Sequence, residues 1–411
     1  MLQVLRRGKQ LADYRGLVRE ELLEEIRALG RELTGVRVLE LNAGLRGGVA
    51  EMLLSLVPLL RDVGVQADWG VLPGDEEFFQ VTKSFHNALQ GREYSLTARD
   101  RRIYLQTNRR LAKRLPSGYE VVIVHDPQPA AVRHLAGPRR ARWIWRCHID
   151  TSRPEPSVWE FLRPLIEEYD AAIFTLPSYV PSGLAGPALF FIPPAIDPLS
   201  AKNRPLPSEI CRQLVGEFGL DPDRPFLLQV SRFDPWKDPL GVIRAYRQVK
   251  KQRPEVQLAL VGSMAYDDPE AWGLYQEVRR EAERDPDLYV LSNLEGVGTL
   301  EVNAFQRTCT VAIQKSLREG FGLTVSEALW KGKPVVAGRT GGIPAQVEDG
   351  VHGFLVESVE ECSTRLLELL ASPDEAAAMG ARGHERVREH FLLPRLLRDE
   401  LRAIKAVLTE S

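Results

Sequence analysis

Short apolar segments alternate with longer segments of helical periodicity along the whole chain, and no other feature constrains the fold as strongly. In the first half, the predicted strands cover residues 36–41, 120–124, 142–146, 171–175 and 188–192. In the second half, they cover residues 225–230, 256–261, 288–291, 309–313 and 334–337. Strands that alternate with helices form parallel sheets, because each parallel connection needs a long crossover. The pattern occurs twice, so the sequence predicts an α/β fold of two doubly wound, Rossmann-like domains.

The predicted domain boundaries follow from the proline-rich residues 193–207, which lack periodicity. A length of 411 residues also suits two domains. We therefore expect an N-terminal domain at 1–195, a linker at 196–220 and a C-terminal domain at 221–389. Residues 390–411 have helical spacing and are predicted to pack back on the first domain. Open parallel sheets bind ligands at the carboxyl ends of their strands, which predicts an active site between the two sheets.

Composition excludes several classes of protein. The chain is 44% hydrophobic and 27% charged, with a net charge of -2, so it has no overall attraction to nucleic acid or anionic lipid. No segment approaches the roughly 20 apolar residues of a membrane span, and the first residues lack a signal peptide core. The four cysteines are widely separated. We therefore expect a cytoplasmic protein with neither a nucleic acid nor a membrane partner.

Familiar metal and nucleotide motifs are missing. The seven histidines have no metal-ligand spacing, so no metal site is predicted. The chain has no Walker phosphate loop, which excludes an ordinary P-loop kinase. After the first predicted strand, Gly44, Gly47 and Gly48 do not form the dinucleotide fingerprint, which disfavours a dehydrogenase. The Gly47–Gly48 turn can still bring backbone close to a sugar or phosphate, although a plain tight turn is the alternative.

The segment at 318–328 (REGFGLTVSEA) is the most informative one for chemistry. Glycines at 320 and 322, on either side of Phe321, allow close approach of a ligand to the backbone. The amides of Leu323 and Thr324 begin the next predicted helix, where they and the helix dipole favour a phosphate group. Glu319 and Glu327 flank this turn, and we expect Glu319 to face a sugar and Glu327 to hydrogen-bond a ribose. Two exposed glutamates beside a turn are the alternative.

The segment at 230–238 (VSRFDPWKD) places Arg232 and Lys237 directly after a predicted strand. Two cations at that position can neutralise a diphosphate leaving group. Simple solvation at the surface is the alternative interpretation.

Polar residues also follow two predicted strands of the first domain. His125 and Asp126 follow one strand, and His148 and Asp150 follow the next. Such side chains can fix sugar hydroxyls at the edge of a parallel sheet. A structural role for the histidines is the alternative.

The segments at 230–238 and 318–328, together with the Gly47–Gly48 turn, resemble the retaining GT-B glycosyltransferases. The resemblance spans both domains and implies a GT-B fold. It also implies that Arg232 and Lys237 hold the donor diphosphate, that Glu327 binds the ribose and that Glu319 contacts the donor sugar. Gly47, Gly48 and residues 320–324 are also expected to bind the donor.

The first domain is similar to the trehalose glycosyltransferring synthases in the segments GVAEMLLSLVPLLRDVGVQADWGVL, FFQVTKSFHNALQG, VVIVHDPQP and WRCHIDTS. By this resemblance, Asp126 and His148 lie around the transferred glucose and count with the catalytic set. Asn42, Arg146 and Asp150 are then expected to bind the acceptor. That family usually has three glycines before VAE, whereas this chain has Arg46 at the first of these positions.

The resemblance implies that the chain makes α,α-trehalose from glucose and a nucleoside-diphosphate glucose (ADP-, UDP- or GDP-glucose), with retention. A front-face mechanism is expected, because no motif supplies a carboxylate nucleophile. No tightly bound cofactor is implied, and Mg²⁺ enters only as a counter-ion of the donor. A homodimer is expected from the resemblance. The alternatives are a retaining trehalose phosphorylase, a GT-B glucosyltransferase with another acceptor, and a sugar-nucleotide-binding protein without catalysis.

Overall fold

The structure is a computed structural model that describes residues 2–3, 8–44, 47–137, 140–264 and 269–409. The chain divides into two units, each with its own sheet. Unit 1 is Met1–Ala195 with Leu393–Ser411, and unit 2 is Ile196–Leu392. Arg46, at the position where the resembled family has a glycine, lies outside the described residues.

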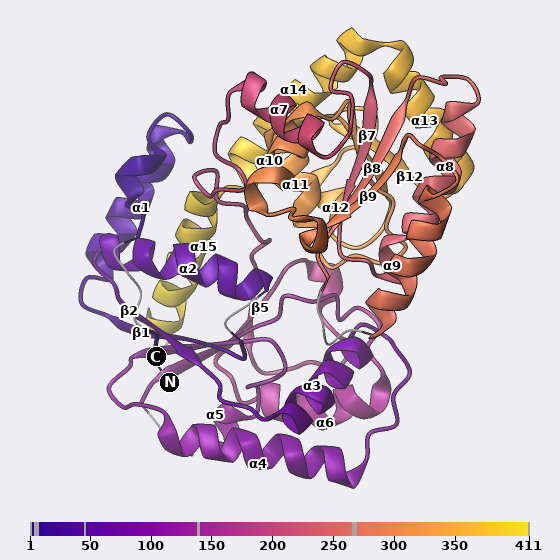
Figure 1. Ribbon diagram of the computed structural model, residues 1–411. Coiled ribbons are helices and arrows are strands. Elements are labelled where there is room, and N and C mark those ends of the chain that lie inside the picture. The colour runs from indigo at the N-terminus through magenta and orange to yellow at the C-terminus, as the bar shows by residue number, and fades with distance from the viewer. Residues whose placement is uncertain (1, 4–7, 45–46, 138–139, 265–268, 410–411) are drawn as a thin grey trace. The chain divides into compact units, whose positions relative to one another are not determined.

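Unit 1 contains a parallel sheet in the order β2-β1-β3-β4-β5-β6 (Figure 1). Its strands are β1 (Arg37–Asn42), β2 (Gln66–Val71), β3 (Val121–His125), β4 (Arg142–Arg146), β5 (Ala171–Phe174) and β6 (Ala188–Phe191). The inner strands are buried on both faces, as a sheet covered by crossover helices requires. Trp143 and Trp145 of β4 are fully buried in this core.

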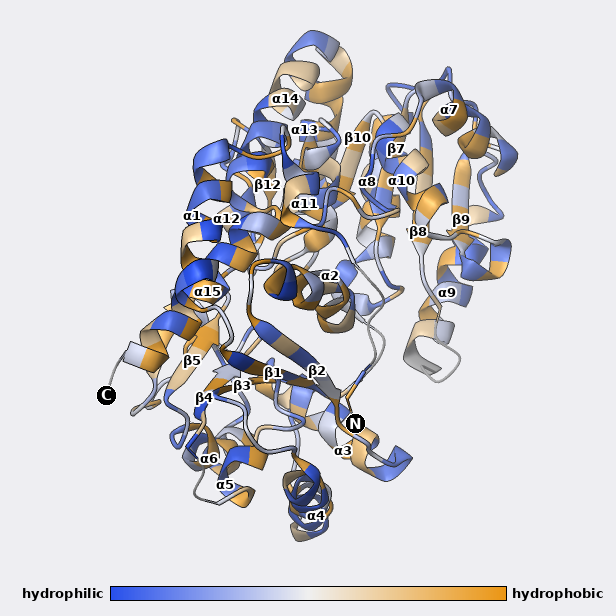
Figure 2. Ribbon diagram, turned by 90° about the vertical axis from the view of Figure 1, so that its left-hand side faces the viewer, coloured by the Kyte–Doolittle hydropathy of each residue, from blue (hydrophilic) through white to orange (hydrophobic). Residues whose placement is uncertain are grey.

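The helices of unit 1 include the last one of the chain. They are η1 (Leu11–Tyr14), α1 (Glu20–Glu32), α2 (Gly48–Asp62), α3 (Glu76–Leu89), α4 (Ala98–Arg114), α5 (Val132–Leu135), α6 (Pro156–Ile166), η2 (Pro177–Tyr179) and α15 (Leu393–Thr409). Helix α15 packs on α1, and Lys405 of α15 forms an ion pair with Glu32. Helix α4 is largely blue in Figure 2, because most of its residues are polar or charged; Tyr104 and Leu111 are among the residues that it buries.

Unit 2 contains a second parallel sheet, in the order β12-β11-β10-β7-β8-β9. Its strands are β7 (Phe226–Val230), β8 (Gln257–Gly262), β9 (Leu288–Ser292), β10 (Val311–Gln314), β11 (Val335–Gly338) and β12 (Gly353–Val356). Its helices are α7 (Ser208–Glu217), η3 (Pro235–Lys237), α8 (Pro239–Lys250), α9 (Pro269–Ala282), η4 (Asn293–Glu295), α10 (Thr299–Thr308), α11 (Leu323–Trp330), α12 (Ile343–Gln346), α13 (Val359–Ala371) and α14 (Pro373–His390).

The predicted fold class of two parallel α/β sheets is confirmed, with two corrections of detail. The sequence predicts five strands per domain, whereas each sheet has six, because β2 and β12 were not predicted. Both are edge strands. The composition of β2 (QADWGV) is weak for a strand, because it carries an amide, a carboxylate and a glycine, whereas the four residues of β12 (GFLV) are mostly apolar. The predicted linker at 196–220 belongs to unit 2 and contains α7, which packs on α10 through the buried Cys211 and Val215.

No helix in the described part of the chain is both long and apolar enough to cross a membrane.

Candidate active site

The loop after β7 is fixed by side chains on both sides of Lys237. Asp234 accepts a hydrogen bond from the Trp236 amide, at 2.9 Å, and so begins the short helix η3. Gln229, at the end of β7, donates to the Lys237 carbonyl oxygen at 2.7 Å. Asp238 has a φ of 48°, a conformation that costs a non-glycine residue energy. Its carboxylate offsets this cost by capping α8 at the Gly241 amide and by pairing with the buried Lys315.

Lys237 and Glu319, two of the predicted site residues, form an ion pair. Lys237 Nζ lies 2.6 Å from Glu319 Oε2, and both side chains are largely buried. The same oxygen accepts a hydrogen bond from Ser316 Oγ at 3.1 Å and a longer one from Gln314 Nε2 at 3.4 Å. Glu319 is therefore a carboxylate held by Lys237, Ser316 and Gln314, among other described residues, at the carboxyl end of β10.

Arg232 differs from Lys237 in its exposure. Its side chain is 68% exposed, and its guanidinium contacts Asp234 Oδ2 through one nitrogen at 3.3 Å. An exposed ion pair with one contact contributes roughly 0–1 kcal/mol. Arg232 can therefore exchange this partner for an anionic ligand at little cost.

The turn before α11 brings backbone amides to the same edge of the sheet. Gly322 has a φ of 82° and begins α11, so the amides of Leu323 and Thr324 lie in the first turn, where no intrahelical acceptor exists. Gly320 accepts a hydrogen bond from the Gly342 amide. Phe321, in contrast, is 5% exposed and packs on Phe391, so its side chain belongs to the core.

Glu327 lies on α11 among buried polar groups. Its carboxylate accepts a hydrogen bond from Gln306 Nε2 at 3.2 Å and lies 3.5 Å from Lys202 Nζ. Lys331, one turn further along α11, donates to Gln306 Oε1 and to Asn203 Oδ1, each at 2.8 Å. The predicted contact of Glu327 with a ribose stays a prediction.

In unit 1, Asp126 and His148 are brought together at the ends of β3 and β4. Asp126 has a φ of 63°, and its Oδ1 accepts a hydrogen bond from the His148 amide at 2.9 Å. Its carbonyl oxygen accepts a hydrogen bond from Trp145 Nε1 at 3.0 Å. Burial raises the pKa of Asp126 to about 6, while the His148 amide opposes this rise. Backbone strain of this kind concentrates at functional sites.

His148 continues into a buried chain of side chains. Its Nε2 lies 2.8 Å from His125 Nδ1, and His125 Nε2 lies 2.7 Å from Glu40 Oε2. The two imidazole rings are nearly parallel, at 11°. Sequence patterns did not single out Glu40, although a glutamate within an apolar strand such as VLEL is a signal that could have found it.

Arg146 is placed differently from the prediction. We expect it beside an acceptor, whereas its side chain is 1% exposed and forms a short ion pair with Glu400 of α15. The guanidinium therefore neutralises a buried carboxylate. Glu400 was also missed, because its partner is 254 residues away in the sequence.

Two further predicted acceptor residues shape their own turns. Asn42 is buried, and its amide donates to the Gly44 carbonyl at 2.7 Å and accepts from Trp69 Nε1 at 2.8 Å. Asp150 accepts a hydrogen bond from the Ser152 amide at 2.9 Å. Contacts of either residue with an acceptor stay predictions.

Gly47 and Gly48 begin α2. Gly47 has a φ of 94°, and space is open around the Cβ position of both glycines. This space is compatible with close approach of a ligand to the backbone. Donor contacts at this turn stay a prediction.

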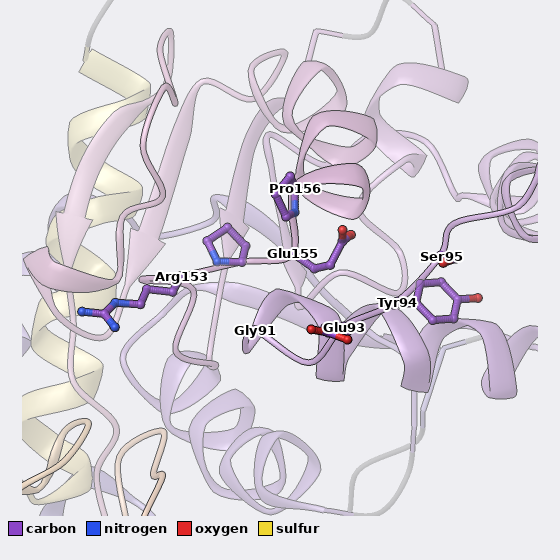
Figure 3. A pocket seen from close by; sticks show the side chains of 8 residues that line it. Gly91, Glu93, Tyr94, Ser95, Arg153, Glu155 and Pro156 are labelled. Carbon is purple, nitrogen blue, oxygen red and sulfur yellow. The ribbon is translucent and has the colours of Figure 1, made fainter.

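A cavity of about 330 Å³ lies in unit 1, between the loop after α3 and the start of α6. Figure 3 shows the side chains that line it. Its lining consists of Gly91, Glu93, Tyr94, Ser95, Arg153, Pro154, Glu155 and Pro156. Glu155 is already used, because its carboxylate caps α6 at the Val158 amide. None of the predicted site residues lines this cavity, so we assign it no ligand.

Within the described residues, no group of three or more histidine, cysteine, aspartate or glutamate side chains is arranged to hold a metal ion.

Comparison with solved structures shows the fold. The chain superimposes on a sucrose-phosphate synthase from Thermosynechococcus elongatus with a TM-score of 0.72 and 16% identity, covering 92% of this chain and 100% of the other. A UDP-forming α,α-trehalose-phosphate synthase from Burkholderia xenovorans gives a TM-score of 0.70 and 17% identity, covering 91% and 100%. At such identities the likeness establishes the GT-B architecture alone.

Sequence comparison shows the family. Residues 41–181 match the family model "Trehalose synthase, N-terminal domain", and residues 213–386 match "Glycosyl transferases group 1". A trehalose synthase of Rubrobacter xylanophilus is 54% identical over 99% of this chain and 100% of the relative. One of Pyrococcus horikoshii is 47% identical over 94% and 93%. The chain therefore belongs to the trehalose synthase family of GT-B glycosyltransferases and is a hexosyltransferase.

Proposed function

We propose that the chain transfers glucose from a nucleoside-diphosphate glucose to free glucose and so makes α,α-trehalose, with retention at the anomeric carbon. The observation that carries the proposal is the 2.6 Å ion pair between Lys237 and Glu319 beside the first turn of α11. A cation, a carboxylate and a helix start at one sheet edge suit a sugar attached to a diphosphate.

The diphosphate is the leaving group in this reaction, and it gains negative charge as its bond to glucose breaks. Lys237 and Arg232 supply two positive charges, and the amides of Leu323 and Thr324 supply hydrogen-bond donors with the helix dipole behind them. Glu327 is assigned to the ribose. The base of the donor is adenine, uracil or guanine.

Glu319 is a poor candidate for a nucleophile. Lys237, Ser316 and Gln314 all donate to its Oε2, which lowers the electron density available for attack on the anomeric carbon. Retention is therefore assigned to a front-face reaction, in which an oxygen of the departing diphosphate accepts the proton of the attacking hydroxyl. Catalysis then consists of positioning, worth roughly 7–11 kcal/mol, and of charge stabilisation, worth about 3–4 kcal/mol per donor.

Asp126 and His148 are assigned to the hydroxyl groups of the transferred glucose. Both are polar groups at neighbouring strand ends, joined through the hydrogen bond from the His148 amide to Asp126 Oδ1. Burial and the nearby Arg146 lower the pKa of His148 well below 6.5, so the imidazole is neutral and can accept a hydrogen bond from a hydroxyl.

A donor panel tests the proposal. The purified protein is incubated with ADP-, UDP- or GDP-glucose and with glucose, and the products are analysed for a non-reducing disaccharide. Formation of α,α-trehalose from at least one donor is expected. Release of glucose from the donor without any disaccharide would contradict the proposal.

A parallel incubation with trehalose and inorganic phosphate distinguishes a trehalose phosphorylase from the proposed synthase. A trehalose phosphorylase of Pleurotus pulmonarius is 30% identical over 75% of this chain but only 48% of the relative. Glucose 1-phosphate formed without nucleotide would favour that reaction over the one proposed. We expect none above the background of a reaction without protein.

A further inference from the structure

Among the described residues of unit 1, the fully buried side chains of Glu40, His125 and Glu400 are ionisable and have no part in the chemistry proposed above. Glu40 lies within β1, His125 ends β3, and Glu400 lies on α15. Burial of an ionisable group without a partner is costly, so each of them must be compensated by its neighbours. Their neighbours lead to His148.

The contacts form one continuous chain. Arg146 pairs with Glu400 Oε2, and the buried carboxyl groups of Glu400 and Glu40 are close enough for each to shift the pKa of the other. Glu40 Oε2 then lies 2.7 Å from His125 Nε2, and His125 Nδ1 lies 2.8 Å from His148 Nε2. The chain therefore runs from the C-terminal helix to a predicted sugar-binding histidine.

The number of protons in this chain follows from its charges. Two carboxylates cannot hydrogen-bond to each other unless one proton lies between them. Glu40 Oε1 and Glu400 Oε1 are both buried and have no hydrogen-bond partner within the described residues. One shared proton satisfies both oxygens and leaves a single negative charge, which Arg146 neutralises. In agreement, burial raises the pKa of Glu40 to about 7 and that of Glu400 well above 4.5.

The position of that proton fixes the tautomers of both histidines. With its proton shared toward Glu400, Glu40 can only accept at Oε2, so His125 carries its hydrogen on Nε2. His125 Nδ1 is then an acceptor, and His148 must donate from Nε2. The remaining nitrogen of His148, Nδ1, keeps its lone pair. Burial lowers the pKa of His125 to about 4, so a doubly protonated imidazole does not interrupt the chain.

We propose that Glu400, Glu40 and His125 are positioning residues that hold His148 in the tautomer with its hydrogen on Nε2, so that Nδ1 accepts a hydrogen bond from a hydroxyl of glucose. The assignment of glucose as the ligand rests on the proposed function, whereas the tautomer does not. By this relay, a helix at the end of the chain sets the hydrogen-bonding character of a side chain at the ends of β3 and β4.

The first test measures the tautomer directly. The full-length protein is labelled with ¹⁵N-histidine, and nitrogen–proton correlation spectra assign the protonated nitrogen of each ring at pH 7.5. The signal of His148 is identified by its loss in His148→Gln. We expect His148 and His125 to be neutral and to carry hydrogen on Nε2. A His148 ring with hydrogen on Nδ1, or with both nitrogens protonated, would overturn the proposal.

The second test uses a matched pair of variants at Glu40. In Glu40→Gln, the amide group donates to Glu400 and its oxygen accepts from His125, so the arrangement is kept. In Glu40→Met, which is similar in volume, His125 loses its acceptor, while Arg146 and Glu400 still neutralise each other. We expect the His148 spectrum of the Gln variant to match the wild type, and that of the Met variant to show both tautomers.

Turnover measurements on the two Glu40 variants give an independent test. We expect kcat for trehalose formation to fall by about tenfold or more in Glu40→Met, and to recover to within about threefold in Glu40→Gln. A Met variant with the wild-type tautomer would overturn the relay. If the wild type makes no trehalose, the proposed function fails, yet the spectra still decide whether the relay exists.

Discussion

The two units have the same architecture, and in each of them an aspartate in the left-handed conformation marks the site. Asp126 follows β3 of unit 1 and Asp238 follows η3 of unit 2, and they are the two non-glycine residues with positive φ in the described part of the chain. Each carboxylate accepts a hydrogen bond from a backbone amide, at His148 and at Gly241 respectively. Similar strain therefore holds two sites of different chemistry.

The two sites differ in where their charges are compensated. In unit 1, Glu40, Arg146 and Glu400 are buried, and Arg146 neutralises Glu400 inside the protein. In unit 2, Arg232 is mostly exposed and pairs with Asp234 at 3.3 Å among the described residues, while Lys237 pairs with Glu319. We call the buried group of unit 1 the closed site and the group around Arg232 and Lys237 in unit 2 the open site. A closed site can present neutral hydrogen-bonding groups of fixed direction, which suits hydroxyls. An open site keeps cations that can change partner, which suits a diphosphate.

Loss of Lys237 is the strongest test of the open site. Lys237→Ala removes the cation next to Glu319 and leaves that buried carboxylate without its ion-pair partner. We expect turnover to fall at least ~100-fold, by analogy with the loss of one charge-stabilising donor. The measurement is kcat with saturating donor and glucose.

The control for this variant is Lys251→Ala. Lys251 is exposed just after α8, and its replacement by alanine removes the same charge. We expect its turnover to match the wild type. Near-normal turnover in Lys237→Ala would remove Lys237 from the site, and with it the contrast between the two units.

Removal of His125 tests the closed site through the pH dependence of stability. The folded pKa of His125, about 4, lies below its ordinary value of 6.5, because burial disfavours the charged ring. Its contribution to stability is therefore fully present above pH 6.5 and is lost as the pH falls toward 4. The pKa values of Glu40 and Asp126 are raised, to about 7 and about 6. Over much of this range, these two groups therefore decrease the free energy of unfolding as the pH rises.

His125→Phe removes the contribution of His125 to this pH dependence and leaves those of Glu40 and Asp126. We expect the stability lost by the variant, relative to the wild type, to grow as the pH rises from about 4 to about 6.5, by up to about 1.4 kcal/mol per pH unit. Urea unfolding followed by tryptophan fluorescence at several pH values measures the difference. A cost that is the same at every pH would show that His125 is not held neutral by its buried surroundings.

The sequence predicted the open site better than the closed one, for a physical reason. The loops at 230–238 and 318–328 keep their functional residues close together in the chain, so local patterns reveal them. The closed site joins β1, β3 and β4 to α15, and its Arg146–Glu400 pair spans 254 residues. Helical periodicity predicts that α15 exists, but not which of its side chains meets which strand. In the fold, apolar inner strands were predictable, whereas the polar edge strand β2 was not.

A pair of glycines at the two ends of α11 gives the smallest expected effect and the most specific test of Glu319. Gly322 and Gly332 have φ values of 82° and 70°, so an alanine at either position is strained by about 1–2 kcal/mol. A Cβ at Gly322 would lie 3.1 Å from Glu319 Cγ, whereas a Cβ at Gly332 meets nothing within 4 Å. We expect similar losses of thermal stability in both alanine variants. Turnover should fall about tenfold only in Gly322→Ala, because the displaced Glu319 disturbs its ion pair with Lys237. Equal turnover in the two variants would mean that the position of Glu319 does not limit the reaction.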